Sequence, residues 1–197
     1  MTRSTTPRTK RIHRPPAPRA GEGVTVWLTG LPSAGKSTIA RALAHRLRTA
    51  GRDVHVLDGD LIRAELSPDL GFSRQDRDAN VRRIGYVARL LASHGVIVVV
   101  AAIAPFADAR QAVKAGHAAD GVGYLEVFLD TPVEECRRRD VKGLYRKQAA
   151  GLISGLTGVD ADYEAPTHPD LRLETHKHPL ASCVEAIEAL LSNHASS

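Results

Sequence analysis

The stretch Gly30-Leu31-Pro32-Ser33-Ala34-Gly35-Lys36-Ser37 decides the fold of this 197-residue chain. It fits the pattern G-x-x-x-x-G-K-S/T, in which main-chain N–H groups and a helix N-terminus surround the phosphates of a nucleotide. In such a loop the lysine neutralises the β- and γ-phosphates and the serine hydroxyl holds Mg²⁺. We therefore predict that Gly30–Ser37, together with Thr38, binds a nucleoside triphosphate with Mg²⁺.

The residues around this loop supply the context that the pattern requires. The apolar, β-rich run Val24–Thr29 precedes it and predicts a strand. After it, Ile39, Leu43 and Leu47 recur at helical spacing until Gly51 provides a C-terminal stop. A strand, a glycine loop and a helix in this order make an ordinary glycine turn a poor alternative.

The remaining sequence alternates between strand and helix patterns. Val96–Ala102 is almost entirely β-branched or small and apolar, as a strand buried on both faces requires. Ser73 and Asp76 form a capping-box pattern at the start of a helix. Further strands are predicted over Val54–Leu57, Tyr124–Leu129 and Leu171–Glu174. Further helices are predicted over Asp108–Ala118 and Leu180–Leu191. Another helix is predicted to begin after Thr131 as its cap, with Pro132 in the first helical position.

This alternation predicts an α/β chain with the three-layer P-loop NTPase fold: a parallel sheet with helices on both faces. The stretch from Lys142 to Pro169 is rich in Gly, Thr, Asp and Pro and weakly periodic, so we interpret it as a lid over about residues 142–169. Ligands of such sheets bind beyond the carboxyl ends of the strands, where the candidate motifs fall.

Charge and length predict one folded unit with a basic leader. Six of the 27 Lys and Arg residues lie in the first twenty residues, which hold no acid, so the rest of the chain is nearly neutral. We expect residues 1–20 to be a flexible tail and 21–197 a single kinase-type domain. No apolar signal region or run of about 18 apolar residues is found, which favours a cytoplasmic protein that binds neither membrane nor nucleic acid.

Two carboxylates separate a kinase from a motor. The predicted strand Val96–Ala102 is followed by Ile103 and Ala104, without the terminal aspartate of motor-type magnesium sites. Asp58 and Asp60 instead follow the second strand and project toward the phosphate loop. An aspartate there can orient and deprotonate an acceptor hydroxyl, or hold a magnesium-bound water, so both are candidate catalytic residues with Lys36. Taken alone, Asp-Gly-Asp is also a common turn.

Basic residues cluster after this pair of aspartates. Arg63, Arg77, Arg82 and Arg83 surround Asn80, and a guanidinium suits phosphate or sulfate in a bidentate contact. An anionic acceptor is therefore plausible. For Arg82 and Arg83, a solvated helix face is an equally good interpretation.

At this point the chain resembles the adenylylsulfate kinase family. The resemblance covers roughly residues 22–192. Beyond the phosphate loop it is carried by LDGDLIR (57–63), LGFSRQDRDANVRRIGYVA (70–88), IAPF (103–106), DTPVEECRRRD (130–140), KGLYRK (142–147) and TGVDADYEAP (157–166). It implies transfer of phosphate from ATP to the 3′-hydroxyl of adenosine 5′-phosphosulfate in sulfate activation.

The resemblance also implies roles for single residues. Phe72 would stack on the acceptor adenine, Asp60 would serve as base or magnesium carboxylate beside the magnesium ligand Ser37, Asp58 would support Asp60, and Arg139 would lie near the donor nucleotide. The other residues implied to contact the acceptor, some from a closing lid, are Arg63, Arg77, Asn80, Ile103, Ala104, Lys142, Gly143 and Leu144. The family is usually homodimeric, and a functional link to ATP sulfurylase is conceivable.

Two departures from the family pattern keep alternatives open. Ala104 stands where a serine that is sometimes phosphorylated often occurs, although direct transfer needs no phosphoserine. Leu156 stands where some relatives place a second adenine-stacking phenylalanine, and losing that face could cost about 0.5–1.5 kcal/mol. A P-loop kinase for another nucleotide-like metabolite hydroxyl, or a non-catalytic nucleotide-binding module, is the alternative.

Overall fold

The computed structural model describes residues 23–195, and its centre is a parallel five-stranded sheet. The strand order is β2-β3-β1-β4-β5, so β1, which leads into the phosphate loop, lies in the middle. The predicted tail, residues 1–20, and the domain ends 21–22 and 196–197 lie outside the described residues. The strands are β1 Val24–Thr29, β2 Val54–Asp58, β3 Ile97–Ala101, β4 Gly123–Leu129 and β5 Leu171–Leu173.

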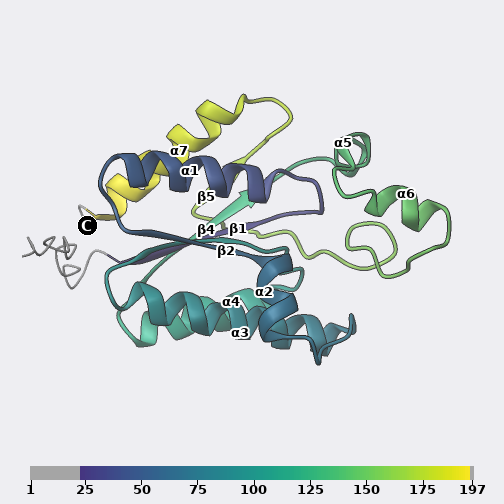
Figure 1. Cartoon of the computed structure of the whole chain (residues 1–197), viewed down its shortest axis with the longest axis horizontal. Helices are drawn as coiled ribbons and strands as arrows, with labels where there is room; N and C mark the ends of the chain where they lie inside the picture. Colours follow the sequence, from purple (N-terminus) through teal and green to yellow (C-terminus); the bar gives the residue numbers. More distant parts are fainter. Residues whose placement is uncertain (1–22, 196–197) are drawn as a thin grey trace, which may run out of the picture.

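Helices cover both faces of this sheet, which confirms the predicted three-layer α/β class (Figure 1). α1 (Lys36–Thr49) and α7 (Leu180–Ala195) pack on one face, and α3 (Arg74–Ala92) and α4 (Ala107–Ala119) on the other. Among residues 23–195, no helix combines the length and apolar character that crossing a bilayer would demand.

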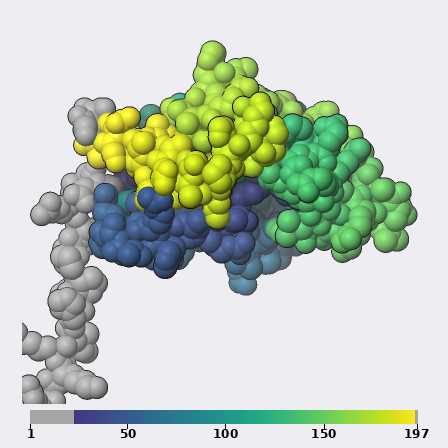
Figure 2. Space-filling model, turned by 90° about the horizontal axis from the view of Figure 1, so that it is seen from above, coloured from purple at the N-terminus to yellow at the C-terminus, as the bar shows by residue number. Residues whose placement is uncertain are grey.

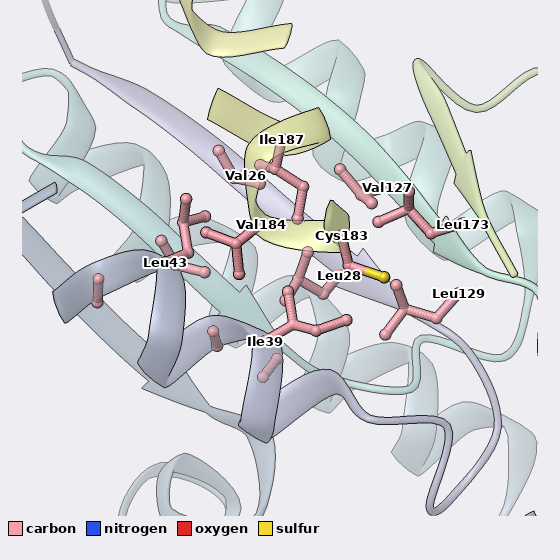
Figure 3. Packing of buried hydrophobic residues seen from close by; sticks show 14 of the residues in the cluster. Val26, Leu28, Ile39, Leu43, Val127, Leu129, Leu173, Cys183, Val184 and Ile187 are labelled. Atoms are coloured by element: carbon pink, nitrogen blue, oxygen red, sulfur yellow. The ribbon is translucent and has the colours of Figure 1, made fainter. Parts of the chain in front are cut away.

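Strand alternation divides the core into two clusters, one on each face. Val26 and Leu28 of β1 point toward α1 and α7, where they pack with Leu43 and Ile187 (Figure 3). Trp27, between them in the sequence, is fully buried in the second cluster under α3 and α4. The central strand is therefore apolar on both sides, which fixes the position of the loop that follows it.

The helix starts follow local chemistry, with one wrong prediction and one omission. Ser73 caps α3 by accepting a hydrogen bond from the Asp76 N–H, as predicted. Thr131 does not cap α5, because its buried hydroxyl bonds to Thr175 instead; Pro132 takes the cap position and the helix begins at Val133. No helix was predicted after the second strand, but α2 (Gly59–Leu66) begins at Asp58-Gly59-Asp60.

The lid segment lies at one end of the molecule, beyond the carboxyl ends of the strands. α5 (Val133–Arg139) and α6 (Leu144–Ala149) lead into and through it, and the rest is irregular apart from a bridge between Thr157 and Ala161. Figure 2 shows this green segment as a lobe at the end opposite the terminus of α7. The lid therefore borders the mouth of the sheet where ligands of this fold bind.

A close helix contact gives a stability prediction for Gly85→Ala. Gly85 of α3 faces Val113 of α4, and an added Cβ would come within 2.5 Å of a Val113 methyl carbon. The clash outweighs the gain in helix propensity of about 1 kcal/mol, so unfolding free energy in urea should fall by about 1–2 kcal/mol. In a Val113→Ala background the same change should cost much less; an equal cost in both backgrounds would contradict the contact.

Candidate active site

A cavity of about 250 Å³ opens at the carboxyl ends of β1, β2 and β3. It lies between the phosphate loop, the starts of α2 and α3, the turn after β3, and the first residues of the lid. The sequence-predicted residues that line it are Pro32, Ser33, Gly35, Lys36, Ser37, Thr38, Asp60, Arg63, Phe72, Arg77, Asn80, Ile103, Ala104, Lys142 and Leu144. The structure thus brings residues from five separate sequence segments to one hollow.

The phosphate loop folds back on itself around the Lys36 side chain. Gly30 and Gly35 have φ angles of 149° and 106°, which favour glycine, and a Cβ on Gly30 would lie 2.8 Å from the Leu129 carbonyl oxygen. Lys36 Nζ donates to the carbonyl oxygens of Gly30 at 2.8 Å and Leu31 at 2.7 Å. The ammonium group is therefore held at the loop opening, where a phosphate would be bound.

The Lys36 side chain is electrostatically unfavourable as a cation in this protein. Burial, with some repulsion from Lys142, lowers the pKa of Lys36 from its ordinary value of 10.5 to about 7. A bound polyphosphate supplies opposite charge and favours the protonated form. The phosphate loop therefore favours the binding of an anion beside Lys36.

Ser37 lies against Asp58 at the end of β2. Ser37 Oγ donates to Asp58 Oδ2 at 2.7 Å, and Asp58 Oδ1 accepts from the main-chain N–H of Asp60 at 3.1 Å. Asp58 therefore caps α2 and faces the loop serine at the same time. A hydroxyl and a carboxylate so close together, beside a triphosphate cradle, fit Mg²⁺, which takes few protein ligands and several phosphate or water oxygens.

Asp60 lies in the first turn of α2 and contacts Lys142, at the start of the segment predicted to be a lid. Its carboxylate hydrogen-bonds and ion-pairs with Lys142, and both side chains are more than half exposed. The contact joins α2 to the residue just before α6. It places the predicted base and the predicted lid lysine together on the cavity wall.

An aromatic ring between two arginines forms the outer part of the cavity. The Phe72 ring is 71% exposed, with the Arg63 guanidinium 4.6 Å and the Arg77 guanidinium 5.9 Å from its centre. Arg77 also donates to Thr157 Oγ1 and to the Gly155 carbonyl oxygen, each at 2.6 Å. An exposed ring with free surface and cations beside it suits a planar base that carries anionic groups.

The turn after β3 forms the floor of the cavity near α3. Ala104 is buried with φ at 46°, an uncommon conformation for a residue with a side chain. Its carbonyl oxygen accepts from Arg110, and the Ile103 carbonyl oxygen accepts from Thr29 Oγ1. Across from this turn, Asn80 lines the cavity, and its buried Oδ1 has no hydrogen-bond partner among the described residues.

Nine residues singled out from the sequence do not line the cavity: Gly30, Leu31, Ala34, Asp58, Arg82, Arg83, Arg139, Gly143 and Leu156. Arg139 donates to Thr175 and to the carbonyl oxygen of Ala34 in the phosphate loop, so it supports the loop from behind. Gly143, with φ at 68°, caps α6. Leu156 is buried in the main core, where it offers no surface to this cavity.

Two site features escaped the sequence analysis. Arg41, on α1, lines the cavity although it is absent from the predicted set. Glu164 holds the turn after β3: its carboxylate accepts from the Ala107 N–H and from Arg74, and its main-chain N–H donates to the Pro105 carbonyl oxygen. The i, i+4 spacing of Ser37 and Arg41 on a helix was a signal that could have identified Arg41.

A phosphate loop on a parallel sheet, a carboxylate pair across from it and a basic, aromatic acceptor pocket define a P-loop small-molecule kinase. The adenylylsulphate kinase family model matches residues 22–174, and the chain belongs to this family.

Individual relatives agree with this assignment. The chain is 50% identical to an adenylyl-sulfate kinase of Synechococcus sp. (strain JA-3-3Ab) over 87% of this chain and 96% of that protein. It is 51% identical to a probable adenylyl-sulfate kinase of Synechocystis sp. (strain ATCC 27184), over 84% of this chain and 91% of the relative. Among solved structures, the Mycobacterium tuberculosis APS kinase CysC in complex with AMPPNP and APS superposes with a TM-score of 0.84 at 44% identity, covering 87% and 98% of the two chains.

The lowered pKa of Lys36 predicts proton uptake when nucleotide binds. At pH 8 the unliganded amine, with a pKa of about 7, is mostly neutral, and a bound polyphosphate should restore its proton. Calorimetric titration with ATP at pH 8, in buffers of different ionisation enthalpy, should give an uptake approaching one proton. At pH 6, where the amine is already protonated, this contribution should nearly vanish.

The control for this measurement is Lys36→Arg, because a guanidinium stays protonated in both states. Uptake at pH 8 should be lost in that variant. An uptake that is the same at pH 6 and pH 8, or that persists in Lys36→Arg, would assign the proton to another group.

Proposed function

We propose that this chain transfers the γ-phosphoryl group of ATP to the 3′-hydroxyl of adenosine 5′-phosphosulfate, giving 3′-phosphoadenosine 5′-phosphosulfate in sulfate activation. The observation that carries the proposal is one cavity with a phosphate loop on one wall and Phe72, Arg63 and Arg77 on the other. Family membership and the 44% identical relative bound to AMPPNP and APS support this choice of donor and acceptor.

The donor side of the reaction rests on the phosphate loop. Residues 30–38 would surround the phosphates of ATP, and Lys36 would neutralise charge on the β- and γ-phosphates. Ser37 and Asp58 would hold Mg²⁺ directly or through water, with Asp60 close by. When bound, this ion would neutralise charge that develops on the phosphate oxygens during transfer.

The acceptor side supplies position and a base. Phe72 would stack on the adenine, and Arg63 and Arg77 would bind the phosphosulfate, with Asn80, Ile103 and Ala104 completing the wall. Asp60 would accept the proton of the attacking 3′-hydroxyl. The lid from Lys142 to Leu144 would close over both substrates and exclude water, which otherwise competes as acceptor.

The charge of the cavity supports two anionic substrates. Among the described residues that line it, five are cations and one is a carboxylate; the cations are Lys36, Arg41, Arg63, Arg77 and Lys142, and the carboxylate is Asp60. Such a surplus of like charge is unfavourable until anions enter. A neutral sugar or alcohol acceptor would leave much of this charge uncompensated.

Other features expected from the sequence stay predictions. These are a homodimer, a functional link to ATP sulfurylase, a cytoplasmic location, and the roles of Arg139 and Gly143. Direct transfer to the acceptor is consistent with Ala104, which cannot carry a phosphoryl group.

Acceptor specificity tests the proposed function directly. ATP consumption should depend on adenosine 5′-phosphosulfate, and other nucleotides or the absence of an acceptor should give background rates. Consumption only with a different acceptor would make the chain a kinase for that metabolite. No consumption with any acceptor would favour a non-catalytic nucleotide-binding module.

The proposed base predicts the behaviour of Asp60→Asn. Removing the carboxylate should lower kcat by about 10²–10⁴-fold, as loss of a general base does, while ATP affinity changes little because the phosphate loop is untouched. Glu65→Gln is the matched control, since Glu65 lies on the same helix, is exposed and does not line the cavity. Unimpaired turnover in Asp60→Asn would remove Asp60 from the chemical step.

A further inference from the structure

Arg41 differs from the other cations of the cavity in having no partner in the part of the chain that the structure describes. The other four cations each donate hydrogen bonds to protein groups. Lys36 donates to carbonyl oxygens of the phosphate loop, and Arg63 donates to the Gly71 carbonyl oxygen. Arg77 donates to Thr157 and Gly155, and Lys142 donates to Asp60. Arg41 lines the same cavity and is exposed, and no hydrogen bond or ion pair to it is found within residues 23–195. Its guanidinium is therefore free to bind a ligand.

The helix fixes the side of the cavity that Arg41 can reach. Arg41 lies four residues after Ser37 on α1, so the two side chains share one face, and helical side chains lean toward the N-terminus. Ser37 faces Asp58, which begins α2. Arg41 is thereby directed along the Ser37 side toward the start of α2, where Gly59 and Asp60 also line the cavity.

The other side of α1 belongs to a different part of the site. A Cβ on Gly35 would lie 3.9 Å from Arg139 Nη1 and 4.0 Å from Thr175 Oγ1, so this edge of the helix faces α5 and the segment after β5. Arg41 is also one helical turn away from the N-terminus of α1, where the loop amides and Lys36 would bind the triphosphate. Arg41 therefore lies apart both from the groups that would bind the triphosphate and from the edge of α1 that faces Arg139 and Thr175.

We propose that Arg41 binds an anionic group of the acceptor, as a third guanidinium beside Arg63 and Arg77. The proposal rests on the proposed function, because it assigns the acceptor, and not ATP, to the α2 side of the cavity. A guanidinium contributes a charge-assisted, directional contact to a phosphate or sulfate oxygen. Arg41 then sets acceptor affinity without taking part in the transfer step.

The test separates acceptor binding from donor binding with Arg41→Gln and Arg41→Lys. In Arg41→Gln, the KM for adenosine 5′-phosphosulfate should rise about tenfold, the size expected for loss of one partly exposed charge-assisted contact, while kcat and the KM for ATP stay within about twofold. Arg41→Lys keeps the charge but loses the planar guanidinium, so its KM for the acceptor should fall between those of the wild type and Arg41→Gln.

The matched control is Arg46→Gln, which removes the same charge from the same helix. Arg46 pairs with Glu188 on the side of α1 that faces α7, away from the cavity, so both KM values should stay at the wild-type level. Thermal unfolding of both Arg41 variants should give midpoints close to wild type, since Arg41 has no structural partner within the described residues. Arg46→Gln loses a partly exposed ion pair, so its midpoint should fall only slightly.

The outcomes distinguish this inference from the proposed function. If the wild-type protein does not consume ATP with adenosine 5′-phosphosulfate, the proposed function itself is wrong. If the wild type is active but Arg41→Gln keeps its acceptor KM, or raises the KM for ATP instead, the assignment of Arg41 to the acceptor is overturned. An equal rise of the acceptor KM in Arg46→Gln would show that loss of any positive charge on α1 weakens acceptor binding. That result would also overturn the assignment of Arg41 to the acceptor.

Discussion

The phosphate loop can form only because β1 is held rigidly in the centre of the sheet. β1 is paired with β3 on one side and β4 on the other, and its side chains are buried on both faces. From this fixed end the chain must turn its main-chain N–H groups inward, which requires positive φ at Gly30, Ser33 and Gly35. Such strained backbone persists because the packing around it over-determines it. The positions of Asp58 and of the turn after β3 follow, because parallel strands end at the same edge.

Charge explains why this edge is a binding site and is not part of the core. Burial lowers the pKa of Lys36, and burial together with the neighbouring Arg63 lowers the pKa of Arg77. Both shifts mean that the folded protein carries these cations at a cost. Anionic substrates would offset that cost, which comes mainly from burial and in smaller part from repulsion by Lys142 and Arg63. Structural residues are rarely arranged this way, whereas active sites commonly are.

The parts of the fold that sequence could predict are those whose signal is local or buried on all sides. Val24–Thr29 was predicted with its observed bounds, since a central strand is continuously apolar. α2 was missed because it is only eight residues long and none of them is buried, although Ile62 packs against the second core cluster. The strand order and the hydrogen bond between Ser37 and Asp58 depend on how distant segments pack, which no local pattern specifies. Arg41 was missed although its i, i+4 spacing from Ser37 places it on the same side of α1, because only the packing of α2 shows what that side faces.

If Asp60 acts as the base and residues 142–169 close over the substrates, the contact between Asp60 and Lys142 links the chemistry to that closure. Lys142 donates to Oδ2 of Asp60, so this pair would have to open before that oxygen could accept a hydrogen bond from a substrate hydroxyl. Both side chains are more than half exposed, and exposed pairs contribute only about 0–1 kcal/mol. A triphosphate or a phosphosulfate, with higher charge than one carboxylate, can therefore draw Lys142 away at little cost. On this argument, the anions that need Lys142 are the same ones whose arrival frees Asp60, which makes the base available only when the substrates are present.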